Sequence, residues 1–373
     1  MDLTLPDFKQ LLKTSPKDLF RREASVVGVD VGLSSVKLVQ LRKEEGRGVL
    51  ETYGELSTGP YLGLSVGQAG TATTDQIVQV IKDLCKEANV TTARAAFSIP
   101  LRSSLLTVIN IPPANNIKLA EVIPLEARKY IPVPVSEVML DWWPIPTQIP
   151  SDDETAKHKP PLQVLVAAVH RDVMNQFKEI GKQAGFGQST FEIETFSAIR
   201  SSVRADLSAT AVLDLGATTT KMTIVDLGVI KRSHTINKGA QDLTMALATS
   251  LNLEFGKAEE IKRKIGLVET AEETQVLPVV SPIVEYIFSE VNKVMVKYGQ
   301  SEGRSIDRII MIGGGALIKG LLPIAQAKTG IDITIGSPFD RVETPPFLSP
   351  VLAEVGPSFS VATGLALRGL QDL

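Results

Sequence analysis

The sequence predicts an α/β protein built from two related halves, and three observations support this prediction. Apolar, β-branched segments alternate with amphipathic helical segments along the chain. A strand–turn–strand motif occurs twice, at an offset of 184 positions from Asp30 to Asp214. The composition, with 43% hydrophobic and 22% charged residues over 373 positions, is typical of a globular protein with ample material for more than one core.

Composition also excludes several classes of function. The formal net charge of −3 argues against a dedicated nucleic-acid binder, which usually carries a basic excess. A single cysteine, Cys85, cannot form an internal disulfide and fits a reducing compartment such as the cytoplasm. The three histidines are far apart and give no zinc-ligand spacing. We find no secretory signal and no uninterrupted apolar run near the roughly 18 residues of a membrane span.

The first half predicts a β-meander followed by mixed elements. Three apolar segments, 26–30, 36–43 and 49–56, predict strands separated by tight turns. Helical spacing predicts a helix over 73–90, with Thr73 or Thr74 as its N-cap. Further along we expect strands within 94–111, a helix from Lys118 towards Pro134, a strand over 137–146, an exposed polar loop at 147–161, a buried strand over 162–170 and a helix over 171–185.

The second half opens with the repeated motif and then becomes mainly helical. Residues 210–224 predict strand, turn and strand. Apolar periodicity predicts helices over 241–251, 256–266 and 281–299. Residues 308–321 predict a strand, a triple-glycine turn and a helix start, and 356–370 predict a C-terminal helix.

The two copies of the motif agree at their polar positions. VVGVDVGLSSVKLVQ at 26–40 aligns with TAVLDLGATTTKMTI at 210–224. The aligned pairs are Asp30 with Asp214, Gly32 with Gly216, Ser34 with Thr218, Ser35 with Thr219, and Lys37 with Lys221. One copy alone would be an ordinary hairpin turn, but two matching copies favour a shared function.

The chemistry of this motif suits phosphate. Glycine lets the backbone approach a bound group, while hydroxyls and consecutive N–H groups form a nest for an anion. A carboxylate at the strand end can hold hydrated Mg²⁺, and Lys37 adds a positive charge. Two such turns facing each other would hold a triphosphate from both sides.

Two further segments are candidates for binding a nucleoside. Gly313–Gly315 lie between a strand and a helix, where a flat group such as adenine can rest on bare backbone and the helix start favours anions, although a tight connection is the alternative. Glu259 and Lys262 share one helix face. Spacing alone favours a solvated salt bridge for this pair over a contact with ribose or adenine.

In this order, the two turns, the helix with Glu259, the glycine turn and the closing ATGLAL helix resemble the actin, sugar-kinase and heat-shock-chaperone ATPase superfamily. The resemblance implies a two-lobed, ribonuclease H-like ATPase fold that binds ATP or ADP with Mg²⁺. It implies that Asp30 and Asp214 hold Mg²⁺ through water. The phosphate-binding residues it implies are Gly32, Leu33, Ser34, Ser35, Lys37, Gly216, Ala217, Thr218, Thr219, Thr220, Lys221 and Gly239; those for the nucleoside are Glu259, Lys262, Gly313, Gly314, Gly315 and Leu317.

Within that superfamily, the segment after the first half resembles the PilM family of type IV pilus assembly, most tellingly in EARKYIPVP, 126–134. This resemblance implies an FtsA-type inserted subdomain and a cytoplasmic protein at the inner face of the inner membrane. It implies a groove for the N-terminal cytoplasmic tail of the membrane protein PilN. This groove would lie between subdomain 1A (25–96, 172–208 and 357–373) and subdomain 1C (97–171). We expect attachment to the membrane only through this partner, with pilus motor ATPases and self-association as further contacts.

The same resemblance gives a division of the chain. A leader, 1–24, precedes the first lobe. Its short apolar helical face suggests either a membrane-surface segment or an arm that is packed on the protein or left loose. We favour the arm because Pro16 cuts the helical face short. The expected subdomains are 1A (25–96, 172–208 and 357–373), 1C (97–171), 2A (209–240 and 302–356) and 2B (241–301).

Two other functions remain open on the sequence. A small-molecule kinase needs a carboxylate base, and the insert offers Glu121, Glu126, Glu137 and Asp141. An FtsA-like division filament would usually carry a C-terminal linker and an amphipathic membrane helix. The given sequence stops at Leu373, a few residues beyond the expected closing helix, and this counts against the filament function. Adjacent Trp142 and Trp143 point to opposite faces of the predicted strand, so we expect one in the core and the other at a partner groove.

Overall fold

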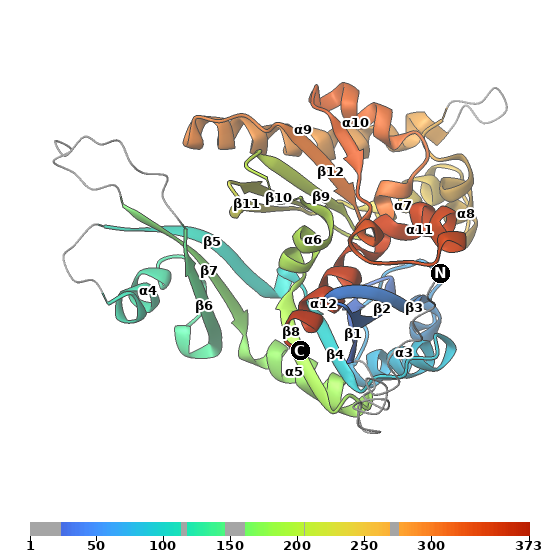
Figure 1. The fold of residues 1–373 in the computed structure, drawn as a ribbon. Helices are drawn as coiled ribbons and strands as arrows, with labels where there is room; N and C mark the ends of the chain where they lie inside the picture. Colours follow the sequence, from blue (N-terminus) through green and yellow to red (C-terminus); the bar gives the residue numbers. More distant parts are fainter. Residues whose placement is uncertain (1–23, 113–117, 146–160, 205, 269–275) are drawn as a thin grey trace, which may run out of the picture.

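The computed structural model describes residues 24–112, 118–145, 161–204, 206–268 and 276–373. The predicted leader and the predicted loop at 147–161 lie outside these ranges, except for the last residue of each. The described chain forms two lobes and a smaller insert (Figure 1).

The first lobe is a five-stranded sheet covered on both faces. Its strand order is β3-β2-β1-β4-β8, with β1, β4 and β8 parallel. The strands are β1 (Ser25–Val31), β2 (Ser35–Glu44), β3 (Arg47–Ser57), β4 (Arg94–Ile99) and β8 (Gln188–Ile193). Helices α3 (Thr74–Glu87) and α5 (Arg171–Gln183) pack on one face, and α6 (Glu194–Ser202) and α12 (Ser360–Gln371) on the other.

The second lobe repeats this plan. Its order is β11-β10-β9-β12-β13, which matches the first lobe strand for strand. The strands are β9 (Thr210–Leu215), β10 (Thr220–Asp226), β11 (Val229–Ile236), β12 (Arg308–Ile312) and β13 (Ile333–Ile335). One face carries α7 (Ala240–Ser250), α8 (Phe255–Ile265), α9 (Val276–Glu302) and α10 (Leu321–Thr329). The predicted α/β protein of two related halves is therefore confirmed.

A core shared by both lobes holds them together. Val212, Ile310 and Ile312 of the second sheet pack in the same cluster as Ala362 and Leu365 of α12. The chain reaches α12 through η5 (Pro338–Arg341), η6 (Pro346–Leu348), α11 (Ser349–Val355) and η7 (Gly356–Phe359). The closing helix therefore belongs to the first lobe although it follows the second in sequence.

Helix α12 lies very close to its neighbours because glycine removes the intervening side chains. A Cβ built on Gly28 of β1 would lie 2.1 Å from the Ala362 carbonyl oxygen, and one on Gly364 would lie 1.9 Å from that of Ser197. The stretch Pro346–Gln371 is long and apolar enough to cross a membrane, yet 61% of its most apolar window is buried inside the protein. Packing against the first sheet makes α12 a core helix.

The insert is a three-stranded sheet of order β5-β7-β6 that follows β4. It comprises η2 (Leu101–Ser103), β5 (Ser104–Ile111), α4 (Leu119–Ala127), η3 (Val135–Glu137), β6 (Val138–Pro144) and β7 (Leu162–His170). Side chains along β7 alternate between two cores, as strand geometry requires. Val164, Val166 and Ala168 face α4, whereas Leu165, Ala167 and Val169 join the core of the first lobe.

That core also reaches into the second lobe. Val225 and Ile230, at the tip of the β10–β11 hairpin, are buried in the cluster that contains Leu165 and Ile145 of the insert. Lys231 Nζ donates to Gln163 Oε1 at 3.0 Å beside this contact. The insert is therefore packed against both lobes.

Several element predictions need correction. The sequence analysis missed β8, α6, β11, β13 and α11, and it began the long helix at residue 281, whereas α9 starts at Val276 and accommodates Pro282. Helix α4 ends at Ala127, so most of the 126–134 run is a turn rather than helix. The triple glycine itself enters the short 3-10 helix η4 (Gly314–Leu317), and the next helix, α10, starts only at Leu321.

Candidate functional site

The two copies of the motif are alike in structure as well as in sequence. Asp30 is paired with Lys37 across the β1–β2 hairpin, and Asp214 is paired with Lys221 across β9–β10. Each turn is closed by a 3.0 Å hydrogen bond from the glycine N–H, Gly32 to the Ser35 carbonyl and Gly216 to the Thr219 carbonyl. The matching register confirms that the repeat is structural.

Both turns open onto one cavity of about 540 Å³ between the lobes. This volume is in the range that holds a small organic ligand. The predicted site residues that line it are Asp30, Gly32, Leu33, Ser34, Ser35, Lys37, Asp214, Gly216, Ala217, Thr218, Thr219, Lys221, Glu259, Lys262, Gly313, Gly314, Gly315 and Leu317.

Two predicted phosphate-binding residues lie behind this lining. The Thr220 hydroxyl is buried and donates to the Lys238 carbonyl at 2.8 Å, inside the hairpin. Gly239 lies against the second turn, where a Cβ would sit 2.6 Å from the Ala217 carbonyl oxygen. Both residues therefore support the second turn from behind, and neither is among the residues that line the cavity.

The floor of the cavity is a charged cluster centred on Lys221. Its ammonium group lies 2.7 Å from Glu194 Oε2 and 3.2 Å from Asp214 Oδ2. Burial lowers the pKa of Lys221, but these carboxylates outweigh it and hold that pKa well above the ordinary value. Lys221 is therefore committed to two carboxylates, whereas the sequence analysis assigned it to phosphate.

Asp30 completes the floor from the first lobe. Its Oδ1 accepts a hydrogen bond from the Ser98 hydroxyl at 2.8 Å. Burial raises the pKa of Asp30 to about 6, and the nearby Glu194 carboxylate adds to the rise, although Lys37 and Lys221 oppose it. The carboxyl groups of Asp30, Asp214 and Glu194 therefore outnumber the ammonium groups of Lys37 and Lys221 beside them.

This donor set suits a hydrated divalent cation. Mg²⁺ prefers carboxylate oxygens and usually keeps several waters. Within the described parts of the chain, no three His, Cys, Asp or Glu side chains converge closely enough to ligate a metal directly. The residues thus fit a cation held through water between Asp30 and Asp214. The positive charge of that cation would favour the ionised form of the buried Asp30 carboxyl.

Lys37 occupies a different environment from its counterpart Lys221. Its ammonium group donates to Ser35 Oγ at 2.6 Å and lies 3.1 Å from the half-exposed Glu55 carboxylate. Burial works against ionisation of Glu55, yet Lys37 keeps the pKa of that carboxyl below its ordinary value. Lys37 therefore lines the cavity beside the first turn, paired with Glu55 of its own lobe.

Glu259 and Lys262 are buried, in contrast to the solvated face that their spacing favours. Lys262 Nζ lies 2.6 Å from Glu259 Oε2 and donates to Thr244 Oγ1 at 2.8 Å. Arg263 Nε holds the other Glu259 oxygen at 2.7 Å. Burial opposes ionisation of Glu259, but Lys262 and Arg263 keep its pKa below the ordinary value. The pair forms a rigid polar wall of the cavity.

The triple glycine forms the opposite wall. Gly313 has φ +83°, and a Cβ there would lie 2.4 Å from Asp214 Oδ1. A Cβ on Gly315 would lie 2.8 Å from the Leu215 side chain, whereas one on Gly314 would meet nothing within 4 Å. The backbone at Gly314 is therefore open to a flat group. Because η4 is a single short 3-10 turn, it does not supply the helix start that the sequence analysis expected to favour anions.

Several cavity residues escaped the sequence analysis, above all Glu194. This residue follows β8, which pairs in parallel with β4 up to Ile99 and Ile193. The carboxyl ends of parallel strands meet at one sheet edge, so an acidic residue just after FEI was a usable signal. The other lining residues that were missed include Glu55, Gln241, Arg263, Lys319 and Glu354.

The proposed kinase bases lie elsewhere. Glu121, Glu126, Glu137 and Asp141 belong to the insert, and none of them is among the described residues that line the cavity.

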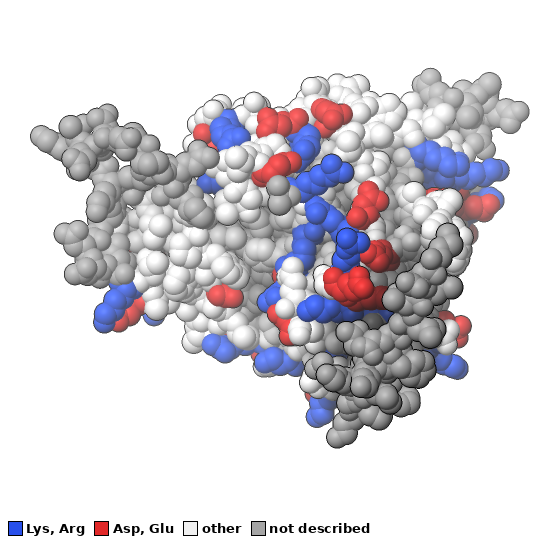
Figure 2. Space-filling view, viewed as in Figure 1, with Lys and Arg blue, Asp and Glu red and all other residues white. Residues whose placement is uncertain are grey.

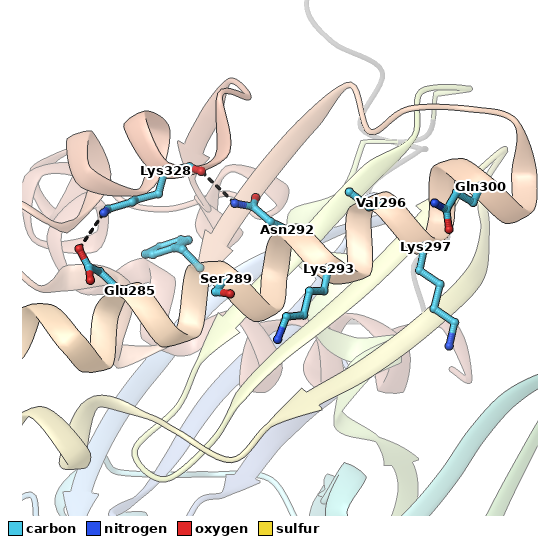
Figure 3. Close-up of a pocket in the computed structure, with 9 residues that line it drawn as sticks. Glu285, Ser289, Asn292, Lys293, Val296, Lys297, Gln300 and Lys328 are labelled. Carbon is cyan, nitrogen blue, oxygen red and sulfur yellow. Dashed lines mark hydrogen bonds and ion pairs between the residues drawn. The ribbon is translucent and has the colours of Figure 1, made fainter.

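A more open hollow of about 800 Å³ runs along α9 (Figure 3). There Lys328 is paired with Glu285, and its carbonyl accepts from Asn292 at 3.0 Å. This hollow is largely one exposed helix face and lacks the convergent charges of the interlobe cavity.

Likeness to solved structures supports the fold class. The chain aligns with the structure titled "PilM-PilN type IV pilus biogenesis complex" at a TM-score of 0.77 and 26% identity, covering 93% of this chain and 99% of that one. It also aligns with the ethanolamine utilization protein EutJ from Carboxydothermus hydrogenoformans at a TM-score of 0.53 and 16% identity, covering 92% and 89%. Two matching lobes that close on one cavity define an actin-like protein with a small inserted subdomain.

The family follows from the sequence match. Residues 28–370 match the family model described as "Type IV pilus assembly protein PilM". The chain belongs to this family, as the 126–134 run and its surroundings indicated.

Proposed function

We propose that this protein is an ATP-binding scaffold of type IV pilus assembly that binds the N-terminal cytoplasmic tail of PilN. One observation carries the nucleotide part of the proposal. Two turns of identical register, one from each lobe, face the same cavity, with the open backbone of Gly314 beside them. This arrangement suits a phosphate chain with a flat base at its end.

Each group would have a distinct task. Backbone N–H groups and hydroxyls of the two turns would bind the phosphates, with Lys37 adding charge beside the first turn. Asp30 and Asp214 would hold Mg²⁺ through water, and the cation would neutralise phosphate charge when bound. Glu259 and Lys262 would contact the nucleoside, whose base would lie on Gly314.

We infer slow hydrolysis or none. A carboxylate at the cavity floor is the natural group to activate a water molecule. With Asp30 and Asp214 assigned to the cation, Glu194 is the remaining carboxylate of this cluster. Both of its oxygens are already engaged, Oε1 by the Leu101 N–H at 2.6 Å and Oε2 by Lys221. An ammonium group bound to a carboxylate weakens it as a base, which favours retention of ATP over its turnover.

The partner part of the proposal is supported by the 26% identity to a PilM–PilN complex over 93% of this chain. We place the tail in a groove between the insert and the first lobe. Trp143 of β6 is 43% exposed and makes an edge contact with Phe196 of α6, with ring centroids 5.5 Å apart. Exposed aromatic side chains of this kind are common anchors for a bound peptide.

The surface of the insert supports recognition through apolar contacts. Figure 2 shows few charged side chains on this part of the molecule, whereas blue and red residues are interspersed over the lobes. Met139, Leu125 and Tyr130 are each at least 40% exposed there. Trp142 instead is partly buried and packs against the core of the insert, so the two tryptophans face opposite sides of the strand as the alternation predicted.

The expected subdomain division belongs to the same proposal. Its 2A segments contain the second five-stranded sheet, and its 1A segments contain the first sheet except for the end of β4, because the proposed boundary at residue 96 falls within that strand. Its 1C segment contains the three strands of the insert. With PilN as the anchor, the protein would work in the cytoplasm against the inner membrane. Contacts with motor ATPases and self-association stay predictions.

Calorimetric titration tests the proposal directly. A synthetic PilN tail is added to the full chain with and without Mg·ATP, and Mg·ATP is titrated separately. We expect one-to-one binding of the tail and of the nucleotide. Absence of tail binding in both states would overturn the scaffold function, and filament pelleting and a kinase substrate screen would then follow.

A matched pair of variants locates the groove. Trp143→Ala should weaken tail binding at least tenfold, because buried aromatic anchors contribute most to such interfaces. Tyr286→Ala, which removes a similarly exposed aromatic residue from α9, should leave it unchanged. Equal effects of both variants would rule out the groove at Trp143.

A further inference from the structure

The segment between β3 and α3 crosses from the first lobe to the second at the mouth of the cavity. It runs from Thr58 to Gly70 and is called the strap here. The Ala69 N–H donates to Gln241 Oε1 at 2.5 Å, and Gln241 begins the second lobe's helix α7. Gly67 lies against α8, where an added Cβ would be 3.1 Å from Arg263 Nη2. Gly67 and Gln241 both line the cavity.

The strap is tied to the first turn at both of its ends. Thr58 N–H donates to the Ser34 carbonyl at 3.0 Å, and the Thr58 hydroxyl donates to the Leu33 carbonyl at 2.8 Å. At the other end Gly70 N–H donates to the same Leu33 carbonyl at 3.2 Å. The backbone of the first turn therefore fixes where the strap lies.

Gln241 is likewise tied to the second turn. Its backbone N–H donates to the Ala217 carbonyl at 2.8 Å, while its side chain holds Ala69. A continuous series of hydrogen bonds thus runs from Leu33 of one turn, through the strap, to Ala217 of the other.

The strap has an ordered structure of its own. Leu64 N–H donates to the Gly59 carbonyl at 2.9 Å, and Gln68 N–H donates to the Ser65 carbonyl at 3.1 Å. Gly67 N–H donates to Ser57 Oγ at 3.1 Å, which anchors the middle of the strap to the end of β3. A segment organised in this way can move as a unit about its two ends.

We propose that the strap retains a nucleotide in the cleft and that Gln241 is its latch. The inference rests on the proposed nucleotide function. Gln241 acts as a positioning residue: it joins the two turns when both adopt their ligand-binding geometry, and the strap must leave α7 before the ligand can depart. The latch should therefore govern the rate of release more than the rate of capture.

Fluorescent N-methylanthraniloyl-ADP with Mg²⁺ provides the test by stopped flow. Gln241→Ala should speed release about fivefold, the loss expected for one net hydrogen bond, with association changed less than twofold. Ser57→Ala removes the bond from the Gly67 N–H and also the bond that the Ser57 hydroxyl donates to the Ser34 carbonyl. It loosens the strap from β3 and from the first turn, and it should also speed release. If both act by freeing the same strap, the double variant should show less than the product of the two effects.

Gln183→Ala is the matched control. This exposed glutamine bonds Glu179 on its own helix α5 at 2.9 Å, and its loss should leave release unchanged. Hydrogen exchange at the Ala69 amide in the nucleotide-free protein gives a second readout. Gln241→Ala should raise that exchange, whereas Gln183→Ala should not.

The outcomes separate the two proposals. If the wild type binds the probe and Gln241→Ala alters neither release nor Ala69 exchange, the latch is overturned and the nucleotide function stands. If the wild type does not bind the probe, both fall. Faster release that is multiplicative with Ser57→Ala would show independent effects and would overturn the strap as a single unit.

Discussion

The Lys221 ammonium group lies 2.7 Å from the Glu194 carboxylate, although the two residues come from opposite lobes. Glu194 begins α6 of the first lobe, and Lys221 lies in β10 of the second. The side chains of both are less than 20% exposed. An ion pair this well buried joins the lobes at the floor of the cavity, directly beneath the two turns.

Removing one partner of this pair should be costly. Lys221→Met leaves Glu194 and Asp214 without their cation, and we expect it to lower the free energy of unfolding by about 3 kcal/mol. Adding Glu194→Gln to Lys221→Met should recover part of that loss. Urea denaturation followed by circular dichroism measures both; a loss below about 1 kcal/mol would contradict a buried pair.

The nucleotide site should depend on Asp214. Asp214→Ala removes one of the two carboxylates that would hold Mg²⁺, while Lys221 keeps its contact with Glu194. We expect Mg·ATP affinity to fall at least tenfold without loss of the fold. Calorimetry on the folded variant makes the measurement, and unchanged affinity would remove the second turn from the site.

The pH dependence of stability should reveal the charge on Asp30. Its pKa in the folded protein, about 6, lies above the ordinary value of 3.8. Ionisation of Asp30 therefore lowers the free energy of unfolding. This loss is absent below pH 4, grows as the pH rises, and is complete above pH 6. Asp30→Asn should stabilise the metal-free protein by about 3 kcal/mol at pH 8 and by little at pH 4. Thermal unfolding at the two pH values is the check, and a gain that does not vary with pH would refute the shift.

Two of the three glycines, Gly313 and Gly314, should respond differently to substitution. Gly313→Ala places a Cβ against Asp214 at positive φ, so we expect a loss of about 2 kcal/mol in stability. Gly314→Ala meets open space and should change stability by less than about 0.5 kcal/mol, while weakening nucleotide binding because the new methyl group projects where the base would lie. Unfolding and calorimetry on the two variants distinguish these roles, and equal losses of stability would contradict them.

Much of the fold could be predicted because local and repeated signals agree. The repeat from Asp30 to Asp214 has matching register in both hairpins, and the hairpin strands have clear apolar patterns. β8 escaped notice because QSTFEI is short and its side chains are only partly buried, so the periodicity is weak. β13, at three residues, offers still less.

The site was harder to predict where tertiary packing decides. Glu259 and Lys262 have the spacing of a surface pair, and contacts from elsewhere in the chain, Thr244 of α7 and Gly67 of the strap, bury them. Lys37 and Lys221 are equivalent in the repeat, yet Glu194 from another element captures one of them. Neither outcome can be read from the spacing of residues along the chain.

The β10–β11 hairpin begins at the second turn and ends with Val225 and Ile230 buried against the insert. The seven residues of β10 span roughly 23 Å at the usual rise of a strand. Because β10 is hydrogen-bonded along this length to β9, the hairpin moves with the second sheet, and a tilt of that sheet by about 5° about the turn would displace the tip by about 2 Å. Such a displacement is large on the scale of close-packed side chains, so the insert would register small adjustments made at the second turn.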